Sequence, residues 1–332
     1  MTGHLTPRED LRVWTLHLAL IAGLFALQYV LPAYHHGVLA RVMVLAVFAM
    51  GYNVLFGYTG LLSLGHAMFF AAGLYGAGLP IYHFGIPPLQ AFAIGIACGA
   101  ALALVVGALA LRTTGVAFMI VTLMFAQVGY LTTLWQGEWT RGDEGLTLSR
   151  SERIVEIGPM FLDMTNPQTR YVIAWVLFAL VLCLTLLVAR SRFGRVLVAI
   201  RENEERTRML GFDTFSNKLA AVVISGTLSA MAGAAYVLLF GYMGATFASI
   251  QYSILPLLWV LLGGAATTLG PFVGTLLMFY LAEMSNDALN AWLPEARLNQ
   301  IGVVGLALIL LVLFFPRGLL GSIRQRWLRW LP

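Results

Sequence analysis

The chain has 332 residues, of which 60% are apolar and only 11% are charged, and its formal net charge is +5. Soluble domains average roughly 45–50% apolar and about 25% charged residues, so this composition excludes an ordinary water-soluble enzyme. Lipid requires every backbone polar group to be satisfied within the protein, which helices achieve locally. We therefore expect an all-α fold, a polytopic transmembrane helical bundle formed as one domain over residues 1–332.

Apolar runs recur along the chain at about the 20 residues that a bilayer core requires. The first run, 13–31, follows two arginines and is too long for the core of a signal peptide, so we expect it to stay as a first transmembrane helix. The later runs of spanning length are 38–56, 86–110, 113–135, 171–189, 219–240 and 300–315.

Two further apolar regions are interrupted by small residues. Residues 60–79 are rich in Gly and Ala, whereas 254–282 is too long for one span and is cut at Gly263-Gly264 and at Gly270-Pro271. Such interruptions are typical of broken or re-entrant helices that line a cavity. With the second region counted as two passes, the chain has about 8–10 membrane segments.

The two interruptions also resemble each other faintly, because Ser63-Leu64-Gly65 is echoed by Thr268-Leu269-Gly270. Paired interruptions in two halves of a chain indicate a transport pathway. The candidate path residues are Tyr58, Thr59, Ser63, Gly65, His66, Gly263, Gly264 and Gly270. The alternative is close helix packing through the glycines. No metal site is expected at His66, since no second ligand lies at helical spacing.

The charges of the loops predict the topology. The 136–170 loop holds four Arg against six acids, the 190–218 loop seven bases against four acids, and the tail 316–332 four Arg and no acid. Basic loops stay in the cytoplasm. We therefore expect 136–170 to be periplasmic, and the 190–218 loop, the tail and both termini to be cytoplasmic.

The chain lacks the signs of an energy source of its own. It has no glycine-rich phosphate loop followed by Lys and Ser or Thr, because its only lysine is Lys218. Secondary carriers usually place ionisable residues inside their spans, and here His17, Arg41 and His66 are the main candidates. These observations predict a subunit that has no cofactor of its own and that depends on another subunit to supply the work of transport. A stand-alone channel or carrier is the more distant alternative.

The basic 190–218 loop contains a short amphipathic pattern. Residues 196–210 are predicted to form one helix, with Leu197, Ile200, Thr207 and Leu210 along one stripe and Gly211 at its end. A stripe flanked by charges suits a helix that docks into a protein groove. The alternative is a helix lying on the inner leaflet.

This loop resembles the coupling loop of ABC importer permeases, and in Ser191-Arg-Phe-Gly194-Arg195 and Ala199-Ile200-Arg201-Glu202-Asn203-Glu204 it is similar to branched-chain amino acid permeases of LivM type. Stretches at 57–67, 262–271 and 314–319 resemble the same family in the expected order. The resemblance covers most of the chain from about 40 to 321.

The resemblance implies a permease subunit of an inner-membrane importer for branched-chain amino acids. Urea or short-chain amides are alternative solutes, because their importers use similar permeases. The implied partners are a sister permease of LivH type, two ATPase subunits of LivG and LivF type, which use the ATP, and a periplasmic amino-acid-binding protein. The implied coupling residues are Gly194, Arg195, Leu197, Ile200, Arg201, Glu202, Glu204, Glu205, Leu210 and Gly211.

Overall fold

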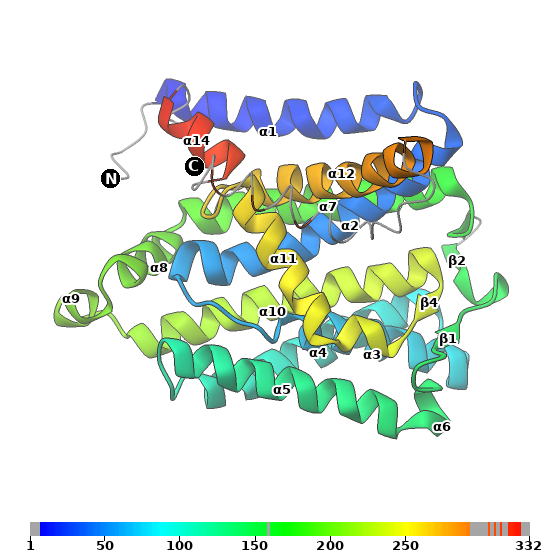
Figure 1. Ribbon diagram of the computed structural model, residues 1–332, viewed down its shortest axis with the longest axis horizontal. Helices are drawn as coiled ribbons and strands as arrows, with labels where there is room; N and C mark the ends of the chain where they lie inside the picture. Colours follow the sequence, from blue (N-terminus) through cyan, green and yellow to red (C-terminus); the bar gives the residue numbers. More distant parts are fainter. Residues whose placement is uncertain are drawn as a thin grey trace.

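The computed structural model describes residues 7–157, 160–292 and 318–326, together with positions 305, 309 and 313. Long helices lie roughly parallel to one another across the molecule, with α11 running obliquely between them (Figure 1). The long helices are α1 (Pro7–Leu27), α2 (Ala33–Asn53), α3 (His66–Phe84), α4 (Pro88–Ala110), α5 (Val116–Trp135), α7 (Pro167–Arg190), α10 (Thr214–Phe240), α11 (Ile250–Gly263) and α12 (Gly270–Trp292).

Short elements occupy the two ends of this bundle. At one end lie α8 (Arg192–Glu202), α9 (Glu204–Met209), α14 (Leu319–Arg326) and the start of α1 (Figure 1). We call it the α8–α9 end. The opposite end, the strand end, carries α6 (Gly137–Thr140) and two small antiparallel sheets (Figure 1). They pair β1 (Leu146–Thr147) with β4 (Tyr242–Met243), and β2 (Ile154–Ile157) with β3 (Met160–Asp163).

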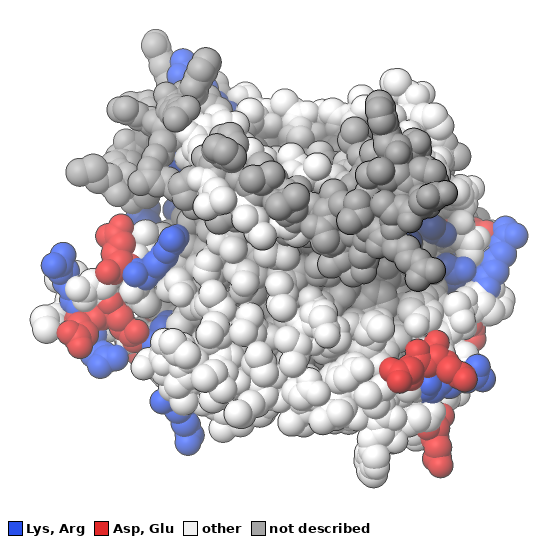
Figure 2. Space-filling view, in the orientation of Figure 1, with Lys and Arg blue, Asp and Glu red and all other residues white. Residues whose placement is uncertain are grey.

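The lengths and the apolar composition of the helices indicate a membrane protein. Within the described residues, five helical stretches are long and apolar enough to cross a bilayer: the continuous stretch from Tyr34 to Tyr58, together with α4, α5, α7 and α10. Shorter apolar helices cover Leu11–Leu27, Ile250–Gly263 and Gly270–Ala282. On the visible face, charged side chains gather at the two ends and leave a broad uncharged middle (Figure 2). The all-α, polytopic fold is therefore confirmed.

The central helices α3, α4 and α10 approach one another closely because glycine and alanine face each other where they cross. A Cβ built on Gly73 would lie 1.9 Å from the Ala230 carbonyl oxygen, and one on Gly99 would lie 2.0 Å from the Ala230 Cβ. Close packing of this kind holds membrane helices together, since lipid provides no hydrophobic driving force between them.

The Gly73 contact yields a stability prediction. Gly73→Val should destabilise the protein by about 3 kcal/mol, because the obstructing atom belongs to the backbone of α10 and the two helices would have to separate. Thermal unfolding in detergent measures the effect. Gly23→Ala is the matched control, since no atom lies within 4 Å of its added Cβ and alanine favours helix. A Gly73→Val protein as stable as this control would contradict the packing.

Most predicted elements are present, but one helix differs from the expectation. Both glycine-rich interruptions are breaks, at 60–65 before α3 and at 264–269 between α11 and α12. The single helix predicted over 196–210 is wrong, because it is divided into α8 and α9 at Asn203. The expected span 300–315 lies outside the described residues apart from positions 305, 309 and 313.

Candidate functional site

The first break begins where α2 loosens into a π-helical turn at Val54–Tyr58. Glycine at position 60 then adopts a φ of +75°, and the chain runs without helix to His66. Polar groups support this stretch: the Tyr52 hydroxyl donates to the Ser63 carbonyl at 3.0 Å, and the Ser253 hydroxyl accepts from the Ala67 N–H at 2.9 Å. π-helical turns are rare and occur frequently at functional sites.

The second break reverses the chain between two tightly packed helices. α11 ends at Gly263, Gly264 has a φ of +118°, and Ala266 has a φ of +59°, which non-glycine residues seldom adopt. A Cβ on Gly263 would lie 1.7 Å from the Gly270 carbonyl oxygen. The loop is therefore held in a strained conformation by the close approach of its flanking helices.

The two breaks are joined by one side chain, Asn53, at the end of α2. Its Nδ2 donates to the Thr267 carbonyl at 3.0 Å, and its Oδ1 accepts from the Ala266 N–H at 3.0 Å. Arg324 of α14 donates to the Ala266 carbonyl at 3.2 Å from the other side. The His17 Nε2 lies 2.8 Å from the Thr268 hydroxyl. We call this set of contacts around the two breaks the break junction.

Asn53→Ala should destabilise the protein by about 2–6 kcal/mol. The substitution leaves the Ala266 N–H and the Thr267 carbonyl without their partner, and each unsatisfied buried group costs about 1–3 kcal/mol. Thermal unfolding in detergent measures the loss. Asn217→Ala should cost less than about 1 kcal/mol, because its amide bonds the Asp213 carbonyl near the surface. Equal losses in the two variants would contradict the role of Asn53.

The predicted coupling residues form two short helices with well-defined caps. The Ser191 hydroxyl accepts from the Gly194 N–H at 3.0 Å at the start of α8, and the Asn203 Oδ1 accepts from the Arg206 N–H at 2.8 Å at the start of α9. Gly194 lies inside α8, where a Cβ would come within 2.3 Å of the Val188 carbonyl oxygen. Gly211, at a φ of +88°, ends α9 as expected.

The predicted docking stripe is mostly covered by this chain: Thr207 is buried together with the two residues of α8, and only Leu210 is exposed. Leu197 and Ile200 are buried in this chain, and Leu197 belongs to the same apolar cluster as Leu55 and Tyr58 of the π-helical turn. They therefore cannot fill a partner's groove, because their own bundle already covers them. Between the Asn203 kink and the start of α10, the exposed large apolar side chains are Met209, Leu210 and Phe212, with Leu210 at 72% exposure. We call these three residues the apolar tip.

Arg201 connects α8 to the first break. Its guanidinium donates to the Gly57 carbonyl, and its Cγ lies 3.0 Å from the place where a Cβ on Gly60 would be. Because Leu197 and Arg201 both contact the break region, α8 and the end of α2 form one packed unit. Arg201 is exposed, as are the charged coupling residues Arg195, Glu202 and Glu205, so the contact with Gly57 and not burial distinguishes it from them.

An ion pair fixes α9 to the start of α10. The Lys218 Nζ donates to Glu204 at 2.6 Å, and Lys218 is almost fully buried. Partial burial raises the pKa of Glu204, but the hydrogen bond and charge of Lys218 outweigh it, so the net shift of this pKa is downward. Glu204 is therefore ionised at neutral pH and orients α9 against the bundle.

The remaining candidate path residues are buried at the two breaks. Tyr58, Thr59, Ser63 and His66 are buried, and Gly65 and the three glycines of the second break are buried as well. The His66 Nε2 lies 2.7 Å from the Ser225 hydroxyl, which itself donates to the Gly51 carbonyl at 2.5 Å. Thr59 bonds back to the Leu55 carbonyl of its own turn. Their role in a path stays a prediction.

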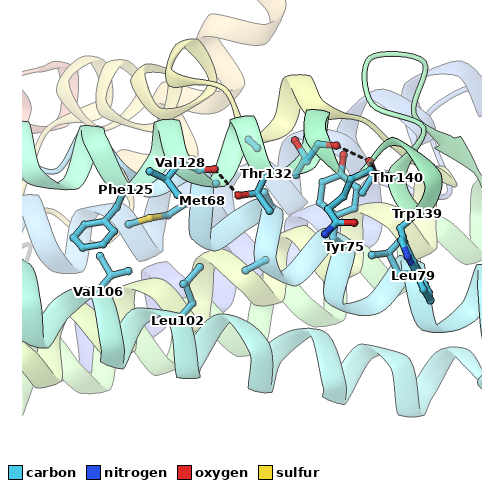
Figure 3. A pocket seen from close by; sticks show the side chains of 16 residues that line it. Met68, Tyr75, Leu79, Leu102, Val106, Phe125, Val128, Thr132, Trp139 and Thr140 are labelled. Atoms are coloured by element: carbon cyan, nitrogen blue, oxygen red, sulfur yellow. Dashed lines mark hydrogen bonds between the residues drawn. The ribbon is translucent and has the colours of Figure 1, made fainter.

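A cavity of about 610 Å³ lies elsewhere, between α3, α4 and α5. Met68, Val106 and Phe125 gather at one end of it, and Tyr75, Trp139 and Thr140 gather at the other (Figure 3). Its lining is apolar except near the strand end, where Thr132, Thr133 and Gln136 add polar groups. None of the predicted path residues lines it.

Sequence reasoning missed the residue that joins the breaks. Asn53 is a polar residue in the predicted span 38–56, and polar groups inside membrane segments usually face the protein interior or serve function. Asn203 also carried a signal, because Asn followed by two glutamates is typical of a helix start.

A polytopic bundle with two helix breaks joined together, and a kinked amphipathic segment packed on one of them, defines a membrane transport protein. Comparison of the sequence with known families specifies it further. The profile of the family described as "Branched-chain amino acid transport system / permease component" matches residues 35–314. The chain belongs to this family of ABC transporter permeases, and it is a multi-pass protein of the bacterial inner membrane.

The similar curated proteins include branched-chain amino acid permeases and autoinducer 2 permeases. The chain is 26% identical to the high-affinity branched-chain amino acid transport system permease protein LivM of Salmonella typhimurium and 27% identical to LivM of Escherichia coli K12. Each match covers 86% of this chain and 69% of the relative. The autoinducer 2 import system permease protein LsrC of Photorhabdus laumondii is 27% identical to this chain, and the match covers 57% of this chain and 53% of LsrC. No solved structure matches.

Proposed function

We propose that this chain is the permease subunit of an ABC importer for branched-chain amino acids. The observation that carries the proposal is the family match over 35–314, supported by LivM relatives that align with 86% of the chain. The LsrC relatives align with a smaller part, 57% in the case of Photorhabdus laumondii. The solute class of LivM is therefore the better supported one.

The proposed complex joins this chain to a sister permease, two ATPase subunits and a periplasmic amino-acid-binding protein. The α8–α9 end faces the cytoplasm in this arrangement, and the strand end, with residues 136–170, faces the binding protein. The excess of basic residues in 190–218 supports this orientation. So does the position of α14 and the start of α1 at the same end as α8 and α9 (Figure 1).

The break junction and the apolar tip suggest how ATP hydrolysis reaches the membrane. The apolar tip binds a groove of the ATPase, and the kink at Asn203 separates it from α8. Because α8 packs on the π-helical turn through Leu197 and Arg201, a displacement of α8 moves the end of α2. Asn53 then passes the movement to the loop between α11 and α12. Such discrete, packed elements are what coupling between distant sites requires.

Uptake into proteoliposomes tests the proposed function. The purified complex should accumulate radiolabelled leucine only when ATP and the binding protein are both present. Urea, a short-chain amide and autoinducer 2 serve as the alternative solutes. Uptake of one of these in place of leucine would refute the solute class, and ATP-independent uptake by this chain alone would refute the importer.

A further inference from the structure

Arg41 is a charge within the membrane that the proposed coupling mechanism does not use. It is the only charged residue of the candidate span Tyr34–Tyr58, and it lies two turns inside α2 from the strand end. A charged side chain at membrane depth is costly, so it is expected to have a function and a partner.

Three arginines from three elements converge on the end of α10. The guanidinium carbons of Arg41 and Arg170 lie 5.1 and 5.2 Å from the centre of the same ring, that of Phe240. The guanidinium of Arg153 packs on the next residue, with its Cζ 2.7 Å from the place where a Cβ on Gly241 would be. We call Arg41, Arg153 and Arg170 the arginine cluster.

The positive charge of this cluster is only partly neutralised by the residues that the structure describes. Asp163 and Glu152 lie within electrostatic range of Arg153, but Asp163 already binds Arg150 at 2.7 Å. In the described part of the chain, no acidic side chain pairs with Arg41 or Arg170, and Arg170 bonds only the Met164 and Thr165 carbonyls. The Nε of Arg153 is buried without a hydrogen-bond partner in the same part of the chain.

The positive charges of Arg41 and Arg153 lie within electrostatic range of Arg170. Like charges without a counter-charge repel each other, and a cation–π contact returns only about 0.5–2 kcal/mol. The arrangement is therefore incomplete without an anion. The planar guanidinium fork matches a carboxylate or a phosphate in two parallel hydrogen bonds. Of these two anions, the proposed amino acid solute carries the carboxylate.

We propose that the arginine cluster is an external binding site for the carboxylate group of an apolar amino acid on its way through the importer. This inference rests on the proposed function and names the part of the solute that the permease recognises. The apolar part of such a solute suits the surroundings, since the ring of Tyr236 packs against Phe240 and, in turn, against Phe247. Urea and neutral amides have no carboxylate, so a transporter of these solutes has no use for the cluster.

Leucine uptake by reconstituted complexes that carry Arg41→Gln or Arg170→Gln tests the site. Each substitution should lower uptake about ten-fold at saturating binding protein, while the affinity of the binding protein for the complex stays unchanged. Arg41→Lys keeps the charge and should retain more uptake than Arg41→Gln. Arg141→Gln is the matched control, because the exposed Arg141 side chain at the same end makes no hydrogen bond or ion pair within the described residues. Uptake by this variant should stay within about two-fold of the unsubstituted complex.

The outcomes separate this inference from the proposed function. If the unsubstituted complex takes up no leucine, the proposed function fails. If it takes up leucine and both glutamine variants do so equally well, only the arginine cluster proposal fails. If the glutamine variants bind the binding protein more weakly, and a higher concentration of binding protein restores their uptake, the cluster binds a carboxylate of the binding protein. That result would overturn the proposal. If one glutamine variant does not assemble into the complex, leucine uptake by the other glutamine variant and by Arg41→Lys tests the proposal.

Discussion

Leu210→Asp is expected to lower ATP-driven leucine uptake at least about ten-fold while the permease folds and inserts normally. Leu210 is 72% exposed, so a charge there meets water in the free chain. In an apolar groove of the ATPase the same carboxylate would be unpaired and desolvated, which costs several kcal/mol. Uptake into proteoliposomes and thermal unfolding of the purified permease measure the two effects.

Leu197→Asp provides the contrast, because the two leucines belong to the same loop and differ in burial. Leu197 is fully buried in the cluster beneath α8, so a carboxylate there should prevent folding or lower the unfolding temperature strongly. Normal uptake by a folded Leu210→Asp complex would show that the apolar tip does not bind the ATPase, and it would favour the interpretation of α9 as a helix on the lipid surface.

Arg201→Gln is expected to separate ATP hydrolysis from transport. The ATPase should still bind, because the apolar tip is intact, and hydrolysis should continue. The charged hydrogen bond from Arg201 to the Gly57 carbonyl, of a kind worth about 1.5–3 kcal/mol, is lost, so α8 moves without the end of α2. The ratio of leucine transported to ATP hydrolysed should therefore fall about ten-fold.

The control for this experiment lies one and a half turns away on the same helix. Arg195 has the same chemistry and is exposed like Arg201, but its side chain makes no hydrogen bond within the described residues. Arg195→Gln should therefore leave the transport ratio within about two-fold. An equal loss in both variants would indicate a general effect of charge in the loop. An unchanged ratio in Arg201→Gln would contradict the proposed route through the first break.

Much of the fold could be predicted from the sequence because local signals specify it. The spans follow from apolar runs, and α4 and α5 begin within three residues of the predicted starts. The breaks follow from Gly-rich stretches, since glycines there adopt φ values that other residues avoid. The echo of Ser63-Leu64-Gly65 in Thr268-Leu269-Gly270 has a structural counterpart, because each motif leads directly into a helix, α3 or α12.

The features that could not be predicted depend on contacts between segments that lie far apart in the sequence. Helical periodicity placed Leu197, Ile200 and Leu210 on one stripe, but it cannot distinguish an apolar face covered by the same chain from one left for a partner. The contact of Asn53 with the loop at Ala266 spans 213 residues. No local pattern predicts it. The arginine cluster likewise requires α2, α7 and the end of α10 to lie together.

The central claim is that the loop containing α8 and α9 is cytoplasmic and docks on the ATPase. Cross-linking tests it most directly. The chain with Cys98→Ala, Cys183→Ala and Leu210→Cys would be assembled into the complex and treated with a short thiol-to-amine cross-linker. We expect a cross-linked product between this chain and an ATPase subunit in inside-out vesicles, and no labelling of position 210 by an impermeant thiol reagent added outside intact cells. Labelling from outside, without a cross-link to the ATPase, would contradict the account.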